Sequence, residues 1–135
     1  MNETAQRLCI WSGPAFAPIM LISLIAMGFL PALPPAYNAS EVVRHYEENR
    51  TLIRIGGTII MQSSVLMLLW VIAISVQLRR VEDGPPILSV VQLVCGVCAN
   101  FLFTFMAAAW TVAAYRPERE PSEIQAWSDF GWFLL

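Results

Sequence analysis

Ile55-Gly-Gly-Thr-Ile-Ile-Met-Gln-Ser-Ser-Val-Leu-Met-Leu-Leu-Trp-Val-Ile-Ala-Ile-Ser-Val-Gln-Leu78 carries no charged side chain along its whole length. An α-helix needs about 20 apolar residues to cross the roughly 30 Å of hydrocarbon in a bilayer, so this stretch is long enough to span one. Leu8–Ser40 and Gly84–Tyr115 share the property, and all eight basic and all ten acidic residues lie outside the three stretches. A soluble domain needs charge on the exposed face of each element. The sequence therefore predicts membrane-spanning helices.

The composition agrees with this prediction. The chain is 57% hydrophobic and 13% charged, with a mean hydropathy of +0.60, whereas ordinary soluble domains are about 25% charged. In lipid, a helix satisfies its own backbone hydrogen bonds. We expect an all-α, polytopic transmembrane helical bundle in a cell membrane, with three full spans at about residues 8–33, 52–78 and 87–115. The lipid bilayer is the expected partner. Nucleic acid is not, because the chain has no basic stripe with interleaved aromatic residues.

A polar segment joins the first two spans. Asn38-Ala-Ser-Glu41 has the form of a capping box, in which two side chains satisfy the first free backbone N–H groups of a helix. Arg44 and Glu48 follow at the i, i+4 spacing of a helical ion pair. We expect a short helix at about residues 40–50, lying at the membrane interface within a single membrane domain of residues 1–135.

Proline marks both ends of the first span. Ser12-Gly-Pro14 predicts a helix start with Ser12 as the N-cap, because a proline in the first turn lacks only an N–H that would be free in any case. The Pro31–Pro35 segment predicts the end of the span. The apolar run is too long for the hydrophobic region of a signal peptide, so we expect it to be retained.

The end of the chain predicts a further helix. Arg116–Pro121 interrupts the third span, Ser122 follows as a helix start, and Gly131-Trp-Phe-Leu-Leu135 is strongly apolar. We interpret residues 122–135 as the incomplete start of a fourth span, which makes the chain a fragment of a longer protein. The alternative is a segment that lies at the interface and is anchored there by its two tryptophans.

Four motifs occur together in a fixed order. They are His45-Tyr-x-x-Asn-Arg-x-x-Ile-Arg54-x-Gly, Gln92-Leu-x-x-Gly96, Trp110-x-x-Ala-Ala-Tyr-Arg116-Pro-x-Arg119 and Asp129-x-Gly-Trp132. In these motifs the chain resembles a family of bacterial multi-pass integral membrane proteins best known from actinobacteria. The resemblance covers nearly the whole chain, and the family members continue with further spans. It implies that this chain is the N-terminal part of such a protein. It implies no activity, because none is established for the family.

Cys95-Gly-Val-Cys98 has the most direct chemical interpretation of any motif here. Two thiols at i, i+3 share one face of a helix, as they do in membrane thiol–disulfide oxidoreductases. Such enzymes usually pass electrons to a second cysteine pair in a loop, and the third cysteine of this chain is Cys9, near the first span. A reactive thiolate also needs an electropositive, partly wet setting. We therefore favour Cys95 and Cys98 as small packing residues, and keep a redox pair as the alternative.

Two ionisable residues near the second span are candidates for function. His45 is the only histidine. It could relay protons or bind a metal, but a metal site needs several ligands at close spacing, so we expect no metal or cofactor and a pairing of His45 with Glu41. Arg54 lies within one turn of the apolar run, where an ionisable group is a functional candidate by default. We expect it to reach the interface and to pair with Glu47 or Glu48.

The third span carries small and polar residues at every fourth position. They are Gln92, Gly96, Asn100, Thr104 and Ala108. Such a face could line a path for a solute or proton. It could also pack against another helix, because small residues let helices approach and amides bond between them. We favour packing, with Gly56-Gly57 and Gln62 of the second span as partners.

The sequence contains no phosphate-binding loop, catalytic carboxylate pair or nucleophile elbow. We therefore favour a multi-pass membrane protein that is not an enzyme and has a structural, accessory or small-solute-handling role. Its further partners would be other transmembrane helices, from a missing C-terminal part or an oligomer partner. The alternative function is that of a membrane thiol–disulfide oxidoreductase.

The orientation in the membrane follows from the arginines. Arg7, Arg79 and Arg80 lie on one side of the predicted spans and the other five arginines on the opposite side. The raw count favours a cytoplasmic location for the larger group. However, Arg79 and Arg80 adjoin a span in the shortest loop, and Arg44 and Arg50 alternate with acidic residues. On balance we favour a cytoplasmic N-terminus.

Overall fold

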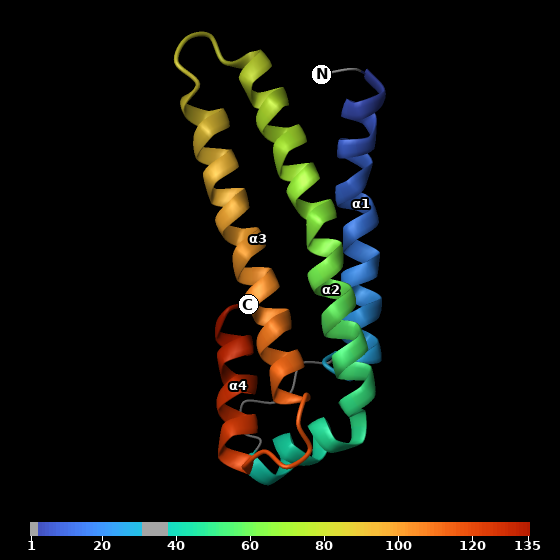
Figure 1. Ribbon diagram of the computed structural model, residues 1–135. Coiled ribbons are helices and arrows are strands. Elements are labelled where there is room, and N and C mark those ends of the chain that lie inside the picture. Colours follow the sequence, from blue (N-terminus) through green and yellow to red (C-terminus); the bar gives the residue numbers. More distant parts are fainter. Residues whose placement is uncertain (1–2, 31–37) are drawn as a thin grey trace.

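The computed structural model describes residues 3–30 and 38–135, and these fold into four α-helices (Figure 1). They are α1 (Glu3–Ala26), α2 (Ala39–Val81), α3 (Ile87–Ala113) and α4 (Pro121–Phe133). The described residues include no strand, which confirms the expected all-α class. The helices α1, α2 and α3 are long and apolar enough to cross a membrane. The 13 residues of α4 are too few for a span.

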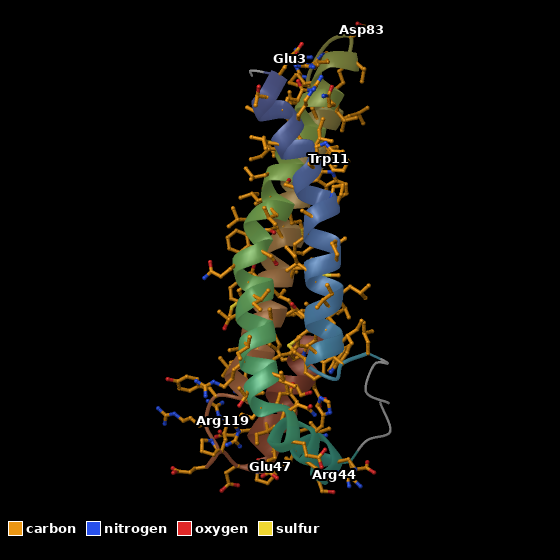
Figure 2. All side chains as sticks on the ribbon, turned by 90° about the vertical axis from the view of Figure 1, so that its right-hand side faces the viewer. Glu3, Trp11, Arg44, Glu47, Asp83 and Arg119 are labelled. Carbon is orange, nitrogen blue, oxygen red and sulfur yellow. The ribbon has the colours of Figure 1, made fainter. Side chains whose placement is uncertain are left out.

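The helix α2 is the central element of the bundle. α1 and α3 each pack against α2, and α4 packs along the lower half of α3 and also contacts α2 (Figure 1). The start of α1, with Glu3, and the α2–α3 turn, with Asp83, lie at the same end of the bundle, and the other end carries Arg44, Glu47 and Arg119 (Figure 2). The charged residues are thus separated into two ends, with the apolar lengths of the three long helices between them.

The helix α2 is longer than any predicted span. Its 43 residues extend about 65 Å at 1.5 Å per residue, more than the 40–45 Å of a whole bilayer. Figure 1 shows its first turns lying across the end of the bundle. The expected helix at residues 40–50 is therefore the first part of α2 and not a separate element, because no glycine or proline interrupts the backbone hydrogen bonding before Gly56. Its start was right: Asn38 Oδ1 accepts from Glu41 N at 3.0 Å, and Asn38 N donates to Glu41 Oε2 at 2.9 Å.

The helix α1 begins earlier than expected. It starts at Glu3, so Ser12 lies inside the helix and donates its hydroxyl hydrogen to the carbonyl of Cys9 at 2.6 Å instead of acting as the N-cap. Pro14 also lies within the helix. Because the helix continues through Ser12, the backbone N–H groups after it have carbonyl partners in the preceding turn, which a helix start at Ser12 would not supply. The helix ends at Ala26, whereas the span was expected to continue to about residue 33. The Pro31–Pro35 segment lies outside the described residues.

Glycines set the spacing between α2 and its neighbours. A Cβ added at Gly13 of α1 would lie 2.5 Å from the Trp70 ring, and one added at Gly56 would lie 2.6 Å from Met27 Cγ. On the other side of α2, a Cβ at Gly57 would collide with Thr111 of α3. Adjacent glycines of α2 therefore face α1 and α3 respectively, which allows both helices to approach the same turn closely.

Candidate functional site

An open groove of about 510 Å³ lies between α2 and α3, near the end of the bundle that carries Arg44 and Arg119. In this groove a charged group borders an apolar wall formed by a membrane-spanning helix. Its lining consists of Thr51, Arg54, Ile55, Thr58, Ile59, Thr111 and Tyr115.

The spacing of the lining residues follows from helix geometry. On α2, the positions from Thr51 to Ile59 recur at intervals of three and four residues, so they form one face of the helix. Thr111 lies in the last turn of α3, and Tyr115 follows directly after the end of that helix. The close approach at Gly57 brings the two helices together and forms the inner wall of the groove.

Arg54 is the only charged residue in the lining. Its guanidinium carbon lies 5.2 Å from the centre of the Tyr115 ring, within range of a cation–π interaction. It forms no ion pair with the residues described here, and Glu48 pairs instead with Arg44 at 3.9 Å. The expected pairing of Arg54 with Glu47 or Glu48 was therefore wrong. The reason is geometric: Arg44 reaches Glu48 from one turn away along α2, whereas Arg54 is directed toward α3.

Two of the three threonines in the groove donate their hydroxyl hydrogens to backbone carbonyls and so offer none to a bound molecule. The Thr58 hydroxyl donates to the carbonyl of Arg54 at 2.7 Å, and the Thr111 hydroxyl donates to the carbonyl of Ala107 at 2.7 Å. Both hydroxyl hydrogens are thus used within their own helices. An incoming group in the groove meets one cation, threonine oxygen acceptors and the side chains of Ile55 and Ile59.

An aromatic cluster supports this end of the bundle from the inside. Phe29 is fully buried, and its ring centre lies 4.7 Å from that of Trp110, 5.6 Å from Trp132 and 6.0 Å from Tyr46. Tyr46 and Trp110 are 1% and 0% exposed. The segment after α1 and the helix α4 cover both side chains. Tyr115, by contrast, is exposed in the groove.

His45 belongs to the same cluster. Its ring stacks on Phe29 with centres 5.4 Å apart, and Nε2 lies 3.2 Å from the carbonyl oxygen of Met27. The expected pairing with Glu41 was wrong, because the carboxylate of Glu41 completes the capping box with Asn38. Across residues 3–30 and 38–135, no three His, Cys, Asp or Glu side chains gather as metal ligands would. The contacts of His45 hold the segment after α1 against α2.

The predicted amide positions lie away from the groove lining. Gln62 is exposed on α2, so its pairing with the α3 repeat was a wrong prediction: its side chain points out of the bundle. Gln92 and Asn100 of α3 are half-buried, and the side-chain oxygen of each accepts no hydrogen bond from a described residue. Packing is seen instead at Gly96, where an added Cβ would collide with Val71 of α2.

The two cysteines of the Cys95–Cys98 motif are exposed on α3 and reduced, and Cys9 is half-buried and also reduced. The neighbouring exposed side chains on α3 are apolar, among them Val94, Phe101 and Leu102. The pair therefore faces the same surroundings as the lipid-facing side of its span.

Sequence reasoning selected Arg54 but missed the groove around it. The position of Arg54 next to an apolar run was a visible signal, whereas Thr51, Thr58 and Thr111 look like ordinary helix residues. The threonine spacing on α2 would have indicated a shared face. Nothing in the sequence showed that Tyr115, which follows α3, would complete it.

Comparisons with known proteins add no relative to this picture. The chain matches no protein-family model, and no curated protein or solved structure is significantly similar to it. The resemblance to an actinobacterial-type membrane family gains no support from these comparisons and stays a hypothesis.

Proposed function

We propose that this protein is a structural or accessory component of the cell membrane that binds an anionic amphiphile in the groove between α2 and α3. The observation that supports the proposal is an arginine without an acidic partner, Arg54, at the edge of an apolar wall. The lining of the groove combines the apolar side chains of Ile55 and Ile59 with one cation, Arg54. This arrangement matches a molecule with an acyl chain and an anionic headgroup.

Two parts of the groove favour a bound lipid: the exposed apolar side chains and the guanidinium. Ile55 and Ile59 are about half exposed and favour contact with hydrocarbon. A guanidinium near lipid headgroups attracts anionic lipids by about 1 kcal/mol, and basic pockets between spans are typical headgroup sites. The planar guanidinium can also bond two phosphate oxygens at once. Together, these features favour an anionic lipid over a zwitterionic one.

The same role fits our preferred orientation, in which the start of α1 and the α2–α3 turn are cytoplasmic. Arg80 of the α2–α3 turn region bonds to Gln6 at 3.0 Å, which joins the two segments at one end. Arg54 and its groove then face the opposite leaflet. This orientation is part of the proposal.

The test is selective lipid retention by the purified full chain. Detergent-solubilised protein would be mixed with equal amounts of phosphatidylglycerol and phosphatidylcholine, and bound lipid would be measured by native mass spectrometry. Arg54→Gln should lower the preference for phosphatidylglycerol about fivefold, as expected for the loss of about 1 kcal/mol. Arg44→Gln, at the same end of the bundle and paired with Glu48, is the matched control and should change little.

Equal preference in the wild type and Arg54→Gln would refute the proposal. Excess inorganic phosphate should displace little phosphatidylglycerol, because the apolar wall binds the acyl chain. Complete displacement by phosphate would indicate a site for a free anion instead.

A thiol–disulfide oxidoreductase remains the second candidate, because Cys95 and Cys98 are both exposed on the lipid-facing side of α3, where a membrane-soluble quinone could reach them. If this role is correct, a quinone added to the membranes should oxidise the two thiols to a disulfide and be reduced to a quinol. A thiol reductant should then reverse the disulfide. Thiols that stay fully reactive toward alkylating reagents under oxidising conditions would exclude it.

A further inference from the structure

The outward face of α2 has a second regular pattern. Its positions recur at intervals of four, three, four and three residues, the spacing of the a and d positions of a coiled coil. They are Ile55, Ile59, Gln62, Leu66 and Leu69. Ile55, Ile59 and Leu69 are 53%, 44% and 37% exposed, Gln62 is exposed and Leu66 is half-buried. No described helix covers this face, which we call the α2 seam.

Gln62 is the residue of the seam that lipid does not explain. It follows Arg54 by eight residues, or about 12 Å along the helix axis, which places it deep within a hydrocarbon layer about 30 Å thick. Its side chain is too short to reach the interface from there. Its side chain makes no hydrogen bond with any residue that the structure describes. A free amide at this depth is unfavourable and is relieved by a hydrogen bond to another helix.

We propose that the α2 seam is the interface of a homodimer, with the Gln62 side chains of two copies bonded to each other. A carboxamide is both donor and acceptor. Two copies in one membrane share an orientation, so a twofold axis along the membrane normal places equivalent seam positions opposite each other. Two Gln62 amides can then exchange reciprocal hydrogen bonds. A single polar residue among apolar a and d positions also fixes the register of parallel helices.

This inference goes beyond the proposed lipid site and does not rest on it. Successive residues are 100° apart around a helix, so Arg54 lies about 80° from Gln62, on the side of α2 that faces α3. The headgroup end of the groove therefore stays open when two seams meet. Ile55 and Ile59 belong to both surfaces, so a partner helix would adjoin the acyl chain of a bound lipid.

The test is disulfide trapping within native membranes. Cys9, Cys95 and Cys98 would be replaced by Ala in the full chain, and Leu69→Cys would be introduced with Gln62 intact. Oxidation should give a covalent dimer on a non-reducing gel. Ala15→Cys is the matched control: it is exposed on α1, and the contact of Gly13 with Trp70 puts it at the same depth. It should remain monomeric.

The role of the amide is tested in the Leu69→Cys background. Gln62→Leu should reduce the trapped dimer at least fivefold, whereas Gln62→Asn, which keeps the amide, should retain most of it. Membrane level and lipid retention of each variant report folding. Equal trapping at Leu69 and Ala15 would overturn the proposal. If Gln62→Leu leaves the amount of trapped dimer unchanged, the proposed hydrogen bond between the two Gln62 side chains is refuted. If Leu69→Cys forms adducts only with other proteins, the homodimer is refuted.

Failure of this inference is distinguishable from failure of the lipid site. Arg54→Gln should lose lipid selectivity and still form the Leu69→Cys dimer. Gln62→Leu should lose the dimer and still retain phosphatidylglycerol. Loss of both properties in both variants would show that the two surfaces form one site, which contradicts the independent seam proposed here.

Discussion

Gly57 marks the closest approach of α2 to α3. An added Cβ would collide with the Thr111 hydroxyl and lie 3.1 Å from the carbonyl oxygen of Ala107. Side-chain volume at this single position therefore controls how α3 lies on α2, and with it the inner wall of the groove.

Gly57→Ala should destabilise the bundle by about 1–3 kcal/mol, the usual cost of overpacking, although alanine favours the helical backbone by about 1 kcal/mol. The measurement is unfolding of the purified chain in mixed detergent, followed by circular dichroism. Adding Thr111→Ala removes the colliding hydroxyl and should restore most of the loss. Thr111→Ala alone is the control. A Gly57→Ala variant as stable as the wild type would contradict the packing.

At the residue scale, the sequence indicated single positions better than their partners. It selected Gly56-Gly57 as packing residues and Asn38 with Glu41 as a cap, because both depend on local spacing. It assigned wrong partners to His45 and Arg54. Those contacts join segments far apart in the chain, which no periodicity encodes.

At the element scale, the α2–α3 turn is held by one carboxylate. Glu82 accepts from the Ser89 hydroxyl at 2.6 Å and from the backbone N–H groups of Leu88 and Ser89 at the start of α3. The Ser89 hydroxyl is the largest cause of a lowered pKa for Glu82, with those N–H groups and Arg79 adding to it. Arg79 also donates to the carbonyl of Gly84 at 3.2 Å.

The lowered pKa gives the turn a pH dependence. A carboxyl group whose pKa is lower in the folded chain contributes stability above its unfolded value of 4.5, and this contribution is lost as the pH falls through the folded value. Glu82→Gln should therefore lower the melting temperature at neutral pH, and its difference from the wild type should shrink below about pH 4.5. Asp83→Asn, in the same turn, is the control. A difference that grows at low pH would contradict the capping role.

Helix boundaries were predicted less well than helix existence. The third apolar stretch, at 87–115, corresponds closely to α3 (Ile87–Ala113), because proline and charge bound it on both sides. α1 begins before its expected start and ends before its expected end, whereas α2 extends beyond both expected limits. Polar residues at a helix end remain helical when no residue breaks the backbone hydrogen bonding. Pro14 does not mark a helix start, because α1 begins at Glu3 and continues through it.

At the scale of the whole molecule, the bundle has two charged ends, and the apolar lengths of α1, α2 and α3 lie between them. Ser40 belongs to the end with the start of α2, and Asp83 belongs to the end with the start of α1 (Figure 2). A membrane between these ends would separate the two positions.

In a cysteine-free background, Ser40→Cys and Asp83→Cys would be treated with a membrane-impermeant maleimide on intact cells. Under our preferred orientation we expect labelling at Ser40→Cys only. Labelling at Asp83→Cys only would reverse the orientation, and equal labelling of both would contradict a membrane between the two ends. Permeabilised cells, in which both sites should react, provide the control for thiol accessibility.

The aromatic cluster has a consequence for the order of assembly during synthesis. Its rings come from four successive parts of the chain: Phe29 after α1, Tyr46 on α2, Trp110 on α3 and Trp132 on α4. Because the helices leave the ribosome in that order, the nascent bundle keeps Phe29 and Trp110 uncovered until α4 has been made. Chains arrested just after α3 should therefore show Trp110 fluorescence that an aqueous quencher reaches, and synthesis through Trp132 should remove that access.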